Sequence, residues 1–412
     1  MTVVVDLLPP NMLGRRFQYA ALSADSSLVA AIDYPAGRAV FYSPDDYVSL
    51  VSILAEAIVA RHTRRTNNNG QASVVSIGRI QVSCGSLDPG PRLYRSGQPD
   101  TRILEDTIYK AARLQRGVPL CYNTTSKGGQ IPAWTHAALT YASLVLNAGG
   151  PVGRTANRLP SLAIATLFSK QRGAGRPRKT GKVNVSIDSL GLALLGGAAS
   201  FMGRESLTGS AVELYLLPDL VSKGYWDLSD RLSDAGGRSA VARAFWIHAN
   251  TGASLELTVS LEAGVSLARS YGVFRGLVPR EALSVLSSAR LYLISSSGKR
   301  PIVRGAIVIG DLLASSYDVH LLRELEAIAS RAAAMKGKGS SQAKRAVAEC
   351  VSDLFMLALD PCNQEHAYNC TRSLMTLAED KNVPGEVREL AASIAGLAPR
   401  EAARLASRAG CA

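Results

Sequence analysis

The sequence lacks acidic residues over one long stretch. From Thr107 to Ile187 there is no Asp or Glu in 81 residues, although the chain of 412 residues contains 33. The same stretch carries twelve Lys or Arg, so it holds +12 of the formal net charge of +13. Solvated surfaces usually mix both signs of charge. This concentration therefore favours a polyanionic partner, with a merely basic solvated face as the alternative.

Long apolar runs are also lacking. No run reaches the roughly 18 residues that span a bilayer, and the most apolar stretch, Leu190 to Met202, contains three glycines. The N-terminus MTVVVDLLPP has no basic start, and Asp6 interrupts its apolar residues, so we expect a strand there and not a signal peptide. The sequence predicts an intracellular, cytoplasmic protein with no membrane partner, which makes nucleic acid the leading polyanion.

Catalytic signatures are missing as well. The sequence has no GxxxxGK[ST] phosphate loop, no HExxH, no GxSxG and no GxGxxG after a strand, and its five histidines are dispersed. We therefore expect a protein that is not an enzyme and that needs no cofactor. A nucleic-acid enzyme with an unrecognised site would need clustered acids or histidines, and the basic stretch has no acids.

Cysteine is scarce and shows no paired spacing. The six cysteines form no CxxC, which predicts neither a disulfide framework nor a zinc ribbon. A disulfide from Cys350 or Cys362 stays open for a thermophilic protein, and the 35 Arg against 11 Lys fit either a thermophile or a GC-rich genome.

One group of metal-ligand residue types occurs near the C-terminus. Cys362, His366 and Cys370 recur every four residues on a predicted helix. Two neighbours could share a metal, but the outer two lie about 12 Å apart along a helix, too far for three ligands of one zinc ion. The simpler interpretation is a helix face with half-buried cysteines, and we predict no metal site.

The N-terminal part shows alternating strand and helix patterns. Ser43 suits a helix N-cap and Pro44 the first helical position, and an apolar stripe follows. This helix ends in Arg61, His62, Arg64 and Arg65, which either complement the helix dipole or contact nucleic acid. We predict strands at 2–8, 28–34 and 74–82, helices at 43–65, 104–115 and 134–146, and a helix or mixed segment at 154–167.

The remainder changes character near residue 318. Strands are predicted at 182–188, 212–217, 290–295 and 302–309, and also at 254–262, where SLELTVSLE alternates apolar and polar residues. Helices are predicted at 190–202, 319–336, 342–359, 363–380, 385–397 and 400–408. The predicted fold class is α+β, with a mixed α/β N-terminal and middle region (1–316) and a C-terminal helical bundle (317–412).

The sequence SKQRGAGRPRKTGK, from Ser169 to Lys182, concentrates the positive charge. Its Gly175-Arg176-Pro177 resembles the core of AT-hook peptides, although Ala174 stands where that motif prefers arginine. Glycine allows close approach to the floor of a DNA minor groove, and arginine fills its electronegative interior. The candidate nucleic-acid-binding residues here are Lys170, Arg172, Arg176, Arg178, Lys179 and Lys182.

A second candidate loop is SKGGQIP, from Ser126 to Pro132. Lys127 and Gln130 flank two glycines there, an arrangement that offers a cation and an amide to base edges. A plain turn is the alternative. Arg154 and Arg158 lead into the basic loop and complete the candidate set.

The stretch SIDSLGLALLGGAASFMGRESLTGSAVELYLLPD, from Ser186 to Asp219, resembles a segment of the large subunits of type I CRISPR effector (Cascade) complexes. In these an apolar Gly/Ala-rich helix precedes a strand that ends in Leu-Pro. The archaeal subtype I-A form is the most similar. The resemblance covers about 35 residues by sequence, and the rest only by the order of its parts.

The resemblance implies a non-catalytic subunit that reads the protospacer-adjacent motif on duplex DNA, aids strand opening and recruits a helicase–nuclease. Its partners would be duplex DNA, guide RNA and other CRISPR effector subunits, with sequence read by base pairing. The candidate loops at 126–132 and 170–182 would then read the motif. A nucleocapsid or architectural DNA- or RNA-binding protein, and a ribosome-associated or RNA-modifying factor, stay open as alternatives.

Overall fold

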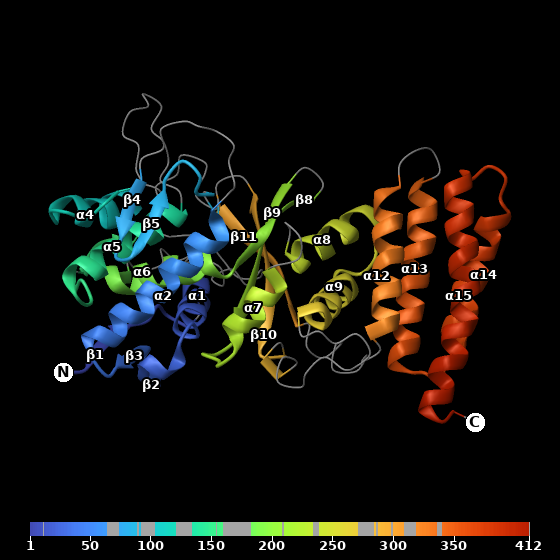
Figure 1. Cartoon of the computed structure of the whole chain (residues 1–412), viewed down its shortest axis with the longest axis horizontal. Helices are drawn as coiled ribbons and strands as arrows, with labels where there is room; N and C mark the ends of the chain where they lie inside the picture. The colour runs from blue at the N-terminus through green and yellow to red at the C-terminus, as the bar shows by residue number, and fades with distance from the viewer. Residues whose placement is uncertain are drawn as a thin grey trace, which may run out of the picture. The chain divides into compact units, whose positions relative to one another are not determined.

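A computed structural model gives the fold of the chain (Figure 1). It divides into two compact units, which we describe separately. Unit 1 comprises Met1–Phe201, Ser210–Trp226 and Tyr292–Ala306, and unit 2 comprises Met202–Gly209, Asp227–Leu291 and Ile307–Ala412. The structure describes residues 1–10, 12–63, 74–88, 90–91, 104–120, 134–153, 155–159, 183–207, 210–233, 239–270, 284–285, 287–297, 300–308, 319–335 and 340–411.

The fold class is mixed α+β with a C-terminal helical region, as the sequence predicts. The predicted domain boundary at residues 316 and 317 stays a prediction. In the part of the chain that the structure describes, no helix is both long enough and apolar enough to cross a membrane.

A small antiparallel sheet begins unit 1. Its strands are β1 (Val3–Asp6), β2 (Val29–Asp33) and β3 (Arg38–Phe41), in the order β1-β3-β2. Helix α1 (Leu13–Leu22) is tied to this region by two buried polar side chains. Arg15 donates to the carbonyl oxygens of Leu8 (2.8 Å) and Tyr34 (3.0 Å), and Gln18 accepts from the Leu8 amide (2.7 Å). These bonds satisfy polar groups that burial would otherwise make costly.

Helix α6 (Ile187–Ala199) is the centre of unit 1. Every residue of α6 is buried, and α1, α2 (Pro44–His62) and α5 (Trp134–Ala148) pack against it (Figure 1). Such burial requires a helix that is apolar on all faces, and Asp188 is its one charged residue. The prediction of a helix at 190–202 is thus confirmed, but its bounds differ. The helix begins at Ile187 and ends at Ala199, before β8 (Phe201–Leu207).

Two glycines of α6 allow this close packing. A Cβ at Gly196 would overlap the backbone carbonyl of Phe17 on α1, and one at Gly191 would overlap the ring of Tyr141 on α5. The missing side chains let the neighbouring helices approach to backbone contact. The glycines that lower helix propensity are therefore required by the packing.

Further strands complete the β structure. A four-stranded sheet has the order β11-β10-β9-β8, with β9 at Ser210–Pro218, β10 at Ala289–Ser297 and β11 at Arg300–Val308. The predicted single strand at 74–82 is instead an antiparallel hairpin of β4 (Val74–Ile77) and β5 (Ile80–Ser83). Gly78 has φ of 58°, a left-handed conformation that lets the chain reverse there. The pattern of apolar residues carried no sign of this turn.

Unit 2 is mostly helical. Its core unites buried apolar residues of α8 (Ala240–Thr251) and α9 (Leu255–Ser270) with those of the C-terminal helices. The latter are α12 (Val319–Ala334), α13 (Ser340–Leu359), α14 (Glu365–Glu379) and α15 (Gly385–Ala409) (Figure 1). The two predicted helices at 385–397 and 400–408 form one helix, which continues through Pro399. Burial of Ala398, Ala402 and Leu405 outweighs the loss of one backbone hydrogen bond at the proline.

The predicted strand at 254–262 is wrong, because these residues begin helix α9. Residues Leu257 to Ala268 are all buried, so the apolar and the polar members of the alternating pattern from Leu257 onward lie inside the fold. Leu257, Leu261 and Val265, spaced four residues apart, join the core of unit 2. The helical spacing was present in the sequence, but the shorter alternating pattern masked it.

A charged cluster built on two buried glutamates joins α8, α9 and α12. Arg243 Nε lies 3.3 Å from Glu262 Oε2, and its Nη2 also contacts Glu326. Arg269 Nη2 lies 3.9 Å from Glu326. Burial, and then the nearby charge of Glu326, raise the pKa of Glu262 to about 8, against the opposing effect of Arg243. Glu262 is therefore protonated in the folded protein at neutral pH.

We predict that Gly196→Ala destabilises unit 1 by about 1–3 kcal/mol, because its Cβ overlaps rigid backbone. Thermal unfolding followed by calorimetry measures the change. Gly396→Ala is the matched control, since Gly396 also lies inside a helix but has no neighbouring atom within 4 Å of the added Cβ. The control should stabilise the protein by about 0.5–1 kcal/mol. Equal effects of the two variants would contradict the close packing of α6.

We predict that the stability of unit 2 falls as pH rises from about 4 to 8. Folded Glu262, with its pKa near 8, retains a proton that the unfolded chain, with a pKa near 4.3, has lost. The slope should reach about 1.4 kcal/mol per pH unit at most and level off above pH 8. Urea unfolding across this range measures it. Glu262→Gln should flatten the slope, whereas Glu256→Gln, an exposed position on the same helix, should leave it unchanged.

Candidate nucleic-acid interface

The basic loop is bracketed by two paired strands. Strand β6 (Thr155–Leu159) pairs antiparallel with β7 (Val183–Ser186), with Thr155 opposite Ser186 and Leu159 opposite Val183. Residues 160–182 join these strands, so the loop's two ends are held together at one stem. The sequence predicted a helix or mixed segment at 154–167. Residues 155–159 form a strand and no helix, and its pairing with β7 has no local sequence signal. Residues 160–167 lie outside the described ranges.

Most of the predicted binding residues lie outside the described part of the chain. Arg158 belongs to β6, and its side chain is not described. The residues outside the described ranges are Lys127, Gln130, Arg154, Lys170, Arg172, Arg176, Arg178, Lys179 and Lys182. The structure therefore describes the strands that carry the candidate interface, but few of its cations.

The carboxylate of Asp188 anchors the stem to the core of unit 1. Its Oδ1 accepts from the Val152 amide and its Oδ2 from the Gly153 amide, each at 2.8 Å. The hydroxyl of Tyr141 on α5 also donates to Oδ1 at 2.9 Å. Hydrogen bonds to an ionised acceptor are stronger than neutral ones. The chain entering the hairpin is thus fixed immediately before β6 begins.

The position of Asp188 follows from how α6 begins. Ser186, the last residue of β7, is the N-cap, and its Oγ accepts from the Ser189 amide at 3.0 Å. Asp188 lies in the first turn, where the helix dipole favours a negative charge. Strand β7, the cap and the anchor are therefore consecutive in sequence, so the same few residues end the hairpin and start the central helix.

Two buried tyrosines complete the anchor. The hydroxyl of Tyr47 on α2 forms a short hydrogen bond with that of Tyr141. Burial, together with neighbouring negative charge from Asp188, raises the pKa of both hydroxyls well above the usual value for tyrosine. Both groups therefore stay protonated, and Tyr141 remains a donor to Asp188. The chain of contacts extends from α2 through α5 to the stem.

The second candidate loop, at 126–132, precedes α5. The first residue of that helix, Trp134, is buried, and its Nε1 donates to the carbonyl of Leu194 on α6 at 2.7 Å. Trp134 also packs edge-on against Phe17, with ring centroids 5.7 Å apart. The loop itself lies outside the described residues, but the helix that follows it is fixed on α6, like the basic hairpin.

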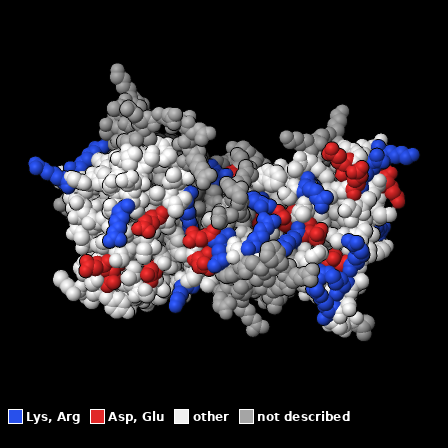
Figure 2. Space-filling model, viewed as in Figure 1, with Lys and Arg blue, Asp and Glu red and all other residues white. Residues whose placement is uncertain are grey.

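Three cations of the acid-free stretch that were not among the predicted binding residues lie on the surface. Lys110 and Arg113 lie on α4 (Lys110–Leu114), which follows a π-helical turn, η2 (Leu104–Tyr109), and Arg116 lies two residues after α4 ends. All three are exposed, and Figure 2 shows basic side chains over α4. Their membership of the acid-free stretch was the signal that could have identified them.

The basic end of α2 does not form part of this surface. His62 is buried, with its Nε2 2.8 Å from the carbonyl oxygen of Ala198, and burial lowers its pKa. Arg61 contacts the carbonyl of Ala199 and lies over the ring of Trp226 at 4.7 Å. His62 and Arg61 thus both pack within unit 1, and the two predicted roles of this helix end, complementing the helix dipole or contacting nucleic acid, stay predictions. Arg64 and Arg65 lie outside the described ranges.

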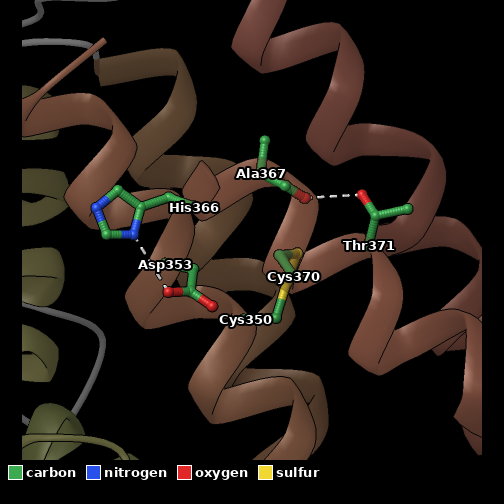
Figure 3. The surroundings of a disulfide bond; sticks show 6 residues. All are labelled: Cys350, Asp353, His366, Ala367, Cys370 and Thr371. Carbon is green, nitrogen blue, oxygen red and sulfur yellow. Dashed lines mark hydrogen bonds and ion pairs between the residues drawn. A yellow bond between two sulfur atoms is a disulfide. The ribbon is translucent and has the colours of Figure 1, made fainter. Parts of the chain in front are cut away.

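The cysteine-rich group near the C-terminus is not a metal site. Cys370 forms a disulfide with Cys350, and Cys362 forms one with Cys411. His366 faces Asp353, with Nδ1 3.4 Å from Oδ1 (Figure 3). No cluster of three metal-ligand side chains occurs among the described residues. The prediction of no disulfide framework is wrong here, and the alternative of a disulfide from Cys350 or Cys362 is confirmed for both. Folding pairs cysteines 20 and 49 residues apart, which no short motif reveals.

Comparison with known proteins finds no matching family model, curated protein or solved structure.

We predict that Asp188→Asn destabilises unit 1 by about 1–3 kcal/mol, because the amide's own N–H groups face backbone donors. Hydrogen exchange at the amides of Val152 and Gly153 should also become faster. Urea unfolding and exchange mass spectrometry measure the two effects. Asp6→Asn is the control: its exposed ion pair with Arg38 should contribute less than about 1 kcal/mol. Unchanged exchange in Asp188→Asn would show that the anchor lies elsewhere.

Proposed function

We propose that this protein is a non-catalytic nucleic-acid-binding subunit of a type I CRISPR RNA-guided surveillance complex, in the role of its large subunit. It would recognise the protospacer-adjacent motif on duplex DNA, aid strand opening and help to recruit the nuclease. Guide RNA and the other effector subunits would be its partners.

The observation that carries nucleic-acid binding is the acid-free stretch from Thr107 to Ile187. Where the structure describes this stretch, it includes three exposed cations around α4 and the paired stem of the basic hairpin. A duplex presents one phosphate per about 1.7 Å of its axis. Cations in a stretch that has no acidic residue are suited to contact with these phosphates.

The anchored stem supports a reading role for the loop. Motif recognition needs a loop that reaches a groove from a fixed base, because register on the duplex is set by positioning contacts and specificity by groove contacts. Asp188 and the β6–β7 pairing provide the fixed base. The Gly175-Arg176-Pro177 sequence provides the type of residues that enter a minor groove.

The CRISPR assignment rests on the resemblance at Ser186–Asp219. The described elements follow the order that this resemblance requires: the buried helix α6, then β8, then β9, which ends in Leu217 and Pro218. This order supports the proposal without being specific to one family. A nucleocapsid or architectural protein should assemble alone on nucleic acid, whereas a CRISPR subunit should require its partner subunits for motif-dependent binding.

We predict that changing Arg176, Arg178 and Lys179 to alanine weakens duplex DNA binding and its salt dependence. If the three cations meet three phosphates, the slope of log K against log salt shrinks by about 2.7. Fluorescence anisotropy over a salt series measures it, with single-stranded DNA and an RNA hairpin as competitors.

The matched control changes Arg331, Arg345 and Arg372, three exposed arginines of unit 2, to alanine. It removes the same charge and should leave the slope nearly unchanged. If the slope falls equally in both variants, the effect comes from net charge and not from the loop. If the slope does not fall in the loop variant, the proposed interface is contradicted. Stronger binding to the hairpin than to the duplex would favour an RNA-directed role.

A further inference from the structure

The two disulfides of the C-terminal helices occupy different environments. Cys350 on α13 and Cys370 on α14 are 1% and 0% exposed and belong to the core of unit 2 (Figure 3). Cys362 is exposed in the turn between α13 and α14, and Cys411 is half-buried just after α15. Thiol–disulfide exchange requires a thiolate to reach a sulfur atom. The second bond is therefore far more accessible to a reductant than the first.

The exposed disulfide fixes the end of the chain. Helix α15 ends at Gly410, whose φ of 71° forms a left-handed cap, and the Cys411 amide then donates to the Ala406 carbonyl at 3.0 Å. This cap turns Cys411 towards Cys362, and the two Cα atoms lie 5.4 Å apart. The bond thereby joins the end of α15 to the start of α14.

The segment held by this bond is the last stretch of α15, beyond Pro399. Pro399 lies inside α15, immediately before this segment, and it has no backbone N–H to donate to the preceding turn. Beyond Pro399, the apolar side chains that are buried are Ala402 and Leu405. The buried Glu401 pairs with Arg404 of the same segment, so this ion pair moves with the segment. Ser407 to Gly410 are exposed, and exposed chain ends are typical of segments that open locally.

We propose that Cys362–Cys411 is a reversible thiol–disulfide exchange site, whose reduction by a dithiol releases the segment Arg400–Cys411 from unit 2. A dithiol thiolate attacks the exposed sulfur of Cys362, and Cys411 leaves as a thiolate that takes up a proton. The second thiol of the reductant then attacks the mixed disulfide and frees Cys362. Two electrons and two protons pass to the protein, and the reductant becomes a disulfide. Cys350–Cys370 stays intact because its sulfurs are buried.

The first test measures which bond is reduced. The full-length protein is titrated with dithiothreitol under native conditions, free thiols are alkylated with N-ethylmaleimide, and peptides are identified by mass spectrometry. Cys362 and Cys411 should be alkylated at least tenfold faster than Cys350 and Cys370. Simultaneous alkylation of all four, or earlier alkylation of the buried pair, would overturn the proposal.

The second test measures release of the segment. Hydrogen exchange of the amides 400–409 should accelerate at least tenfold in the reduced protein and in the double variant Cys362→Ser, Cys411→Ser. Amides of α13 should be unchanged in both, which separates release from general unfolding. Oxidation of the reduced wild type should restore protection. If the amides 400–409 of the reduced protein or of the double variant exchange as slowly as those of the oxidised protein, the bond does not hold this segment.

Discussion

The buried carboxylate of Asp188 is the constraint on which the arrangement of unit 1 depends. It lies in the first turn of the central helix α6, and it holds the two amides that precede the basic hairpin. Because α1, α2 and α5 all pack on α6, the position of the stem is coupled to the core through a few hydrogen bonds. The same glycine-rich helix that allows close packing thus also positions the candidate interface. A rigid base beneath a charged loop is what recognition of a groove requires.

Unit 2 depends on different interactions. Its apolar core is continuous from α8 to α15, and it encloses a carboxyl pair with its arginine partners and one disulfide. The protonated Glu262 avoids placing two negative charges side by side in a region of low dielectric constant. The outer disulfide constrains the last turns of α15, where apolar burial is smallest. Unit 2 therefore combines an ordinary helical core with covalent restraint at the end of the chain.

Local signals allowed part of this fold to be predicted. Ser43 caps α2 and Pro44 opens it, as their residue types indicate, and the four C-terminal helices follow their apolar spacing. The prediction at 254–262 failed because burial of α9 from Leu257 to Ala268 removed the contrast between its faces. The pairing of β6 with β7, the Asp188 anchor and the two disulfides depend on residues distant in sequence, which no local pattern encodes. The charge distribution indicated the basic stretch, including its exposed cations on α4. The paired strands and the Asp188 anchor that hold its hairpin could be recognised only from the structure.

Unit 1 thus contains the anchored stem of the basic hairpin, and unit 2 contains a helical core with two disulfides. The most direct measurement is photo-crosslinking of the full-length protein to a DNA duplex that contains 5-iodouracil, followed by mass spectrometry of the crosslinked peptides. If the acid-free stretch binds nucleic acid, the crosslinks fall mainly between Thr107 and Ile187. Crosslinks confined to other regions, or none at concentrations where the protein binds the duplex, would contradict the assignment of this stretch as the interface.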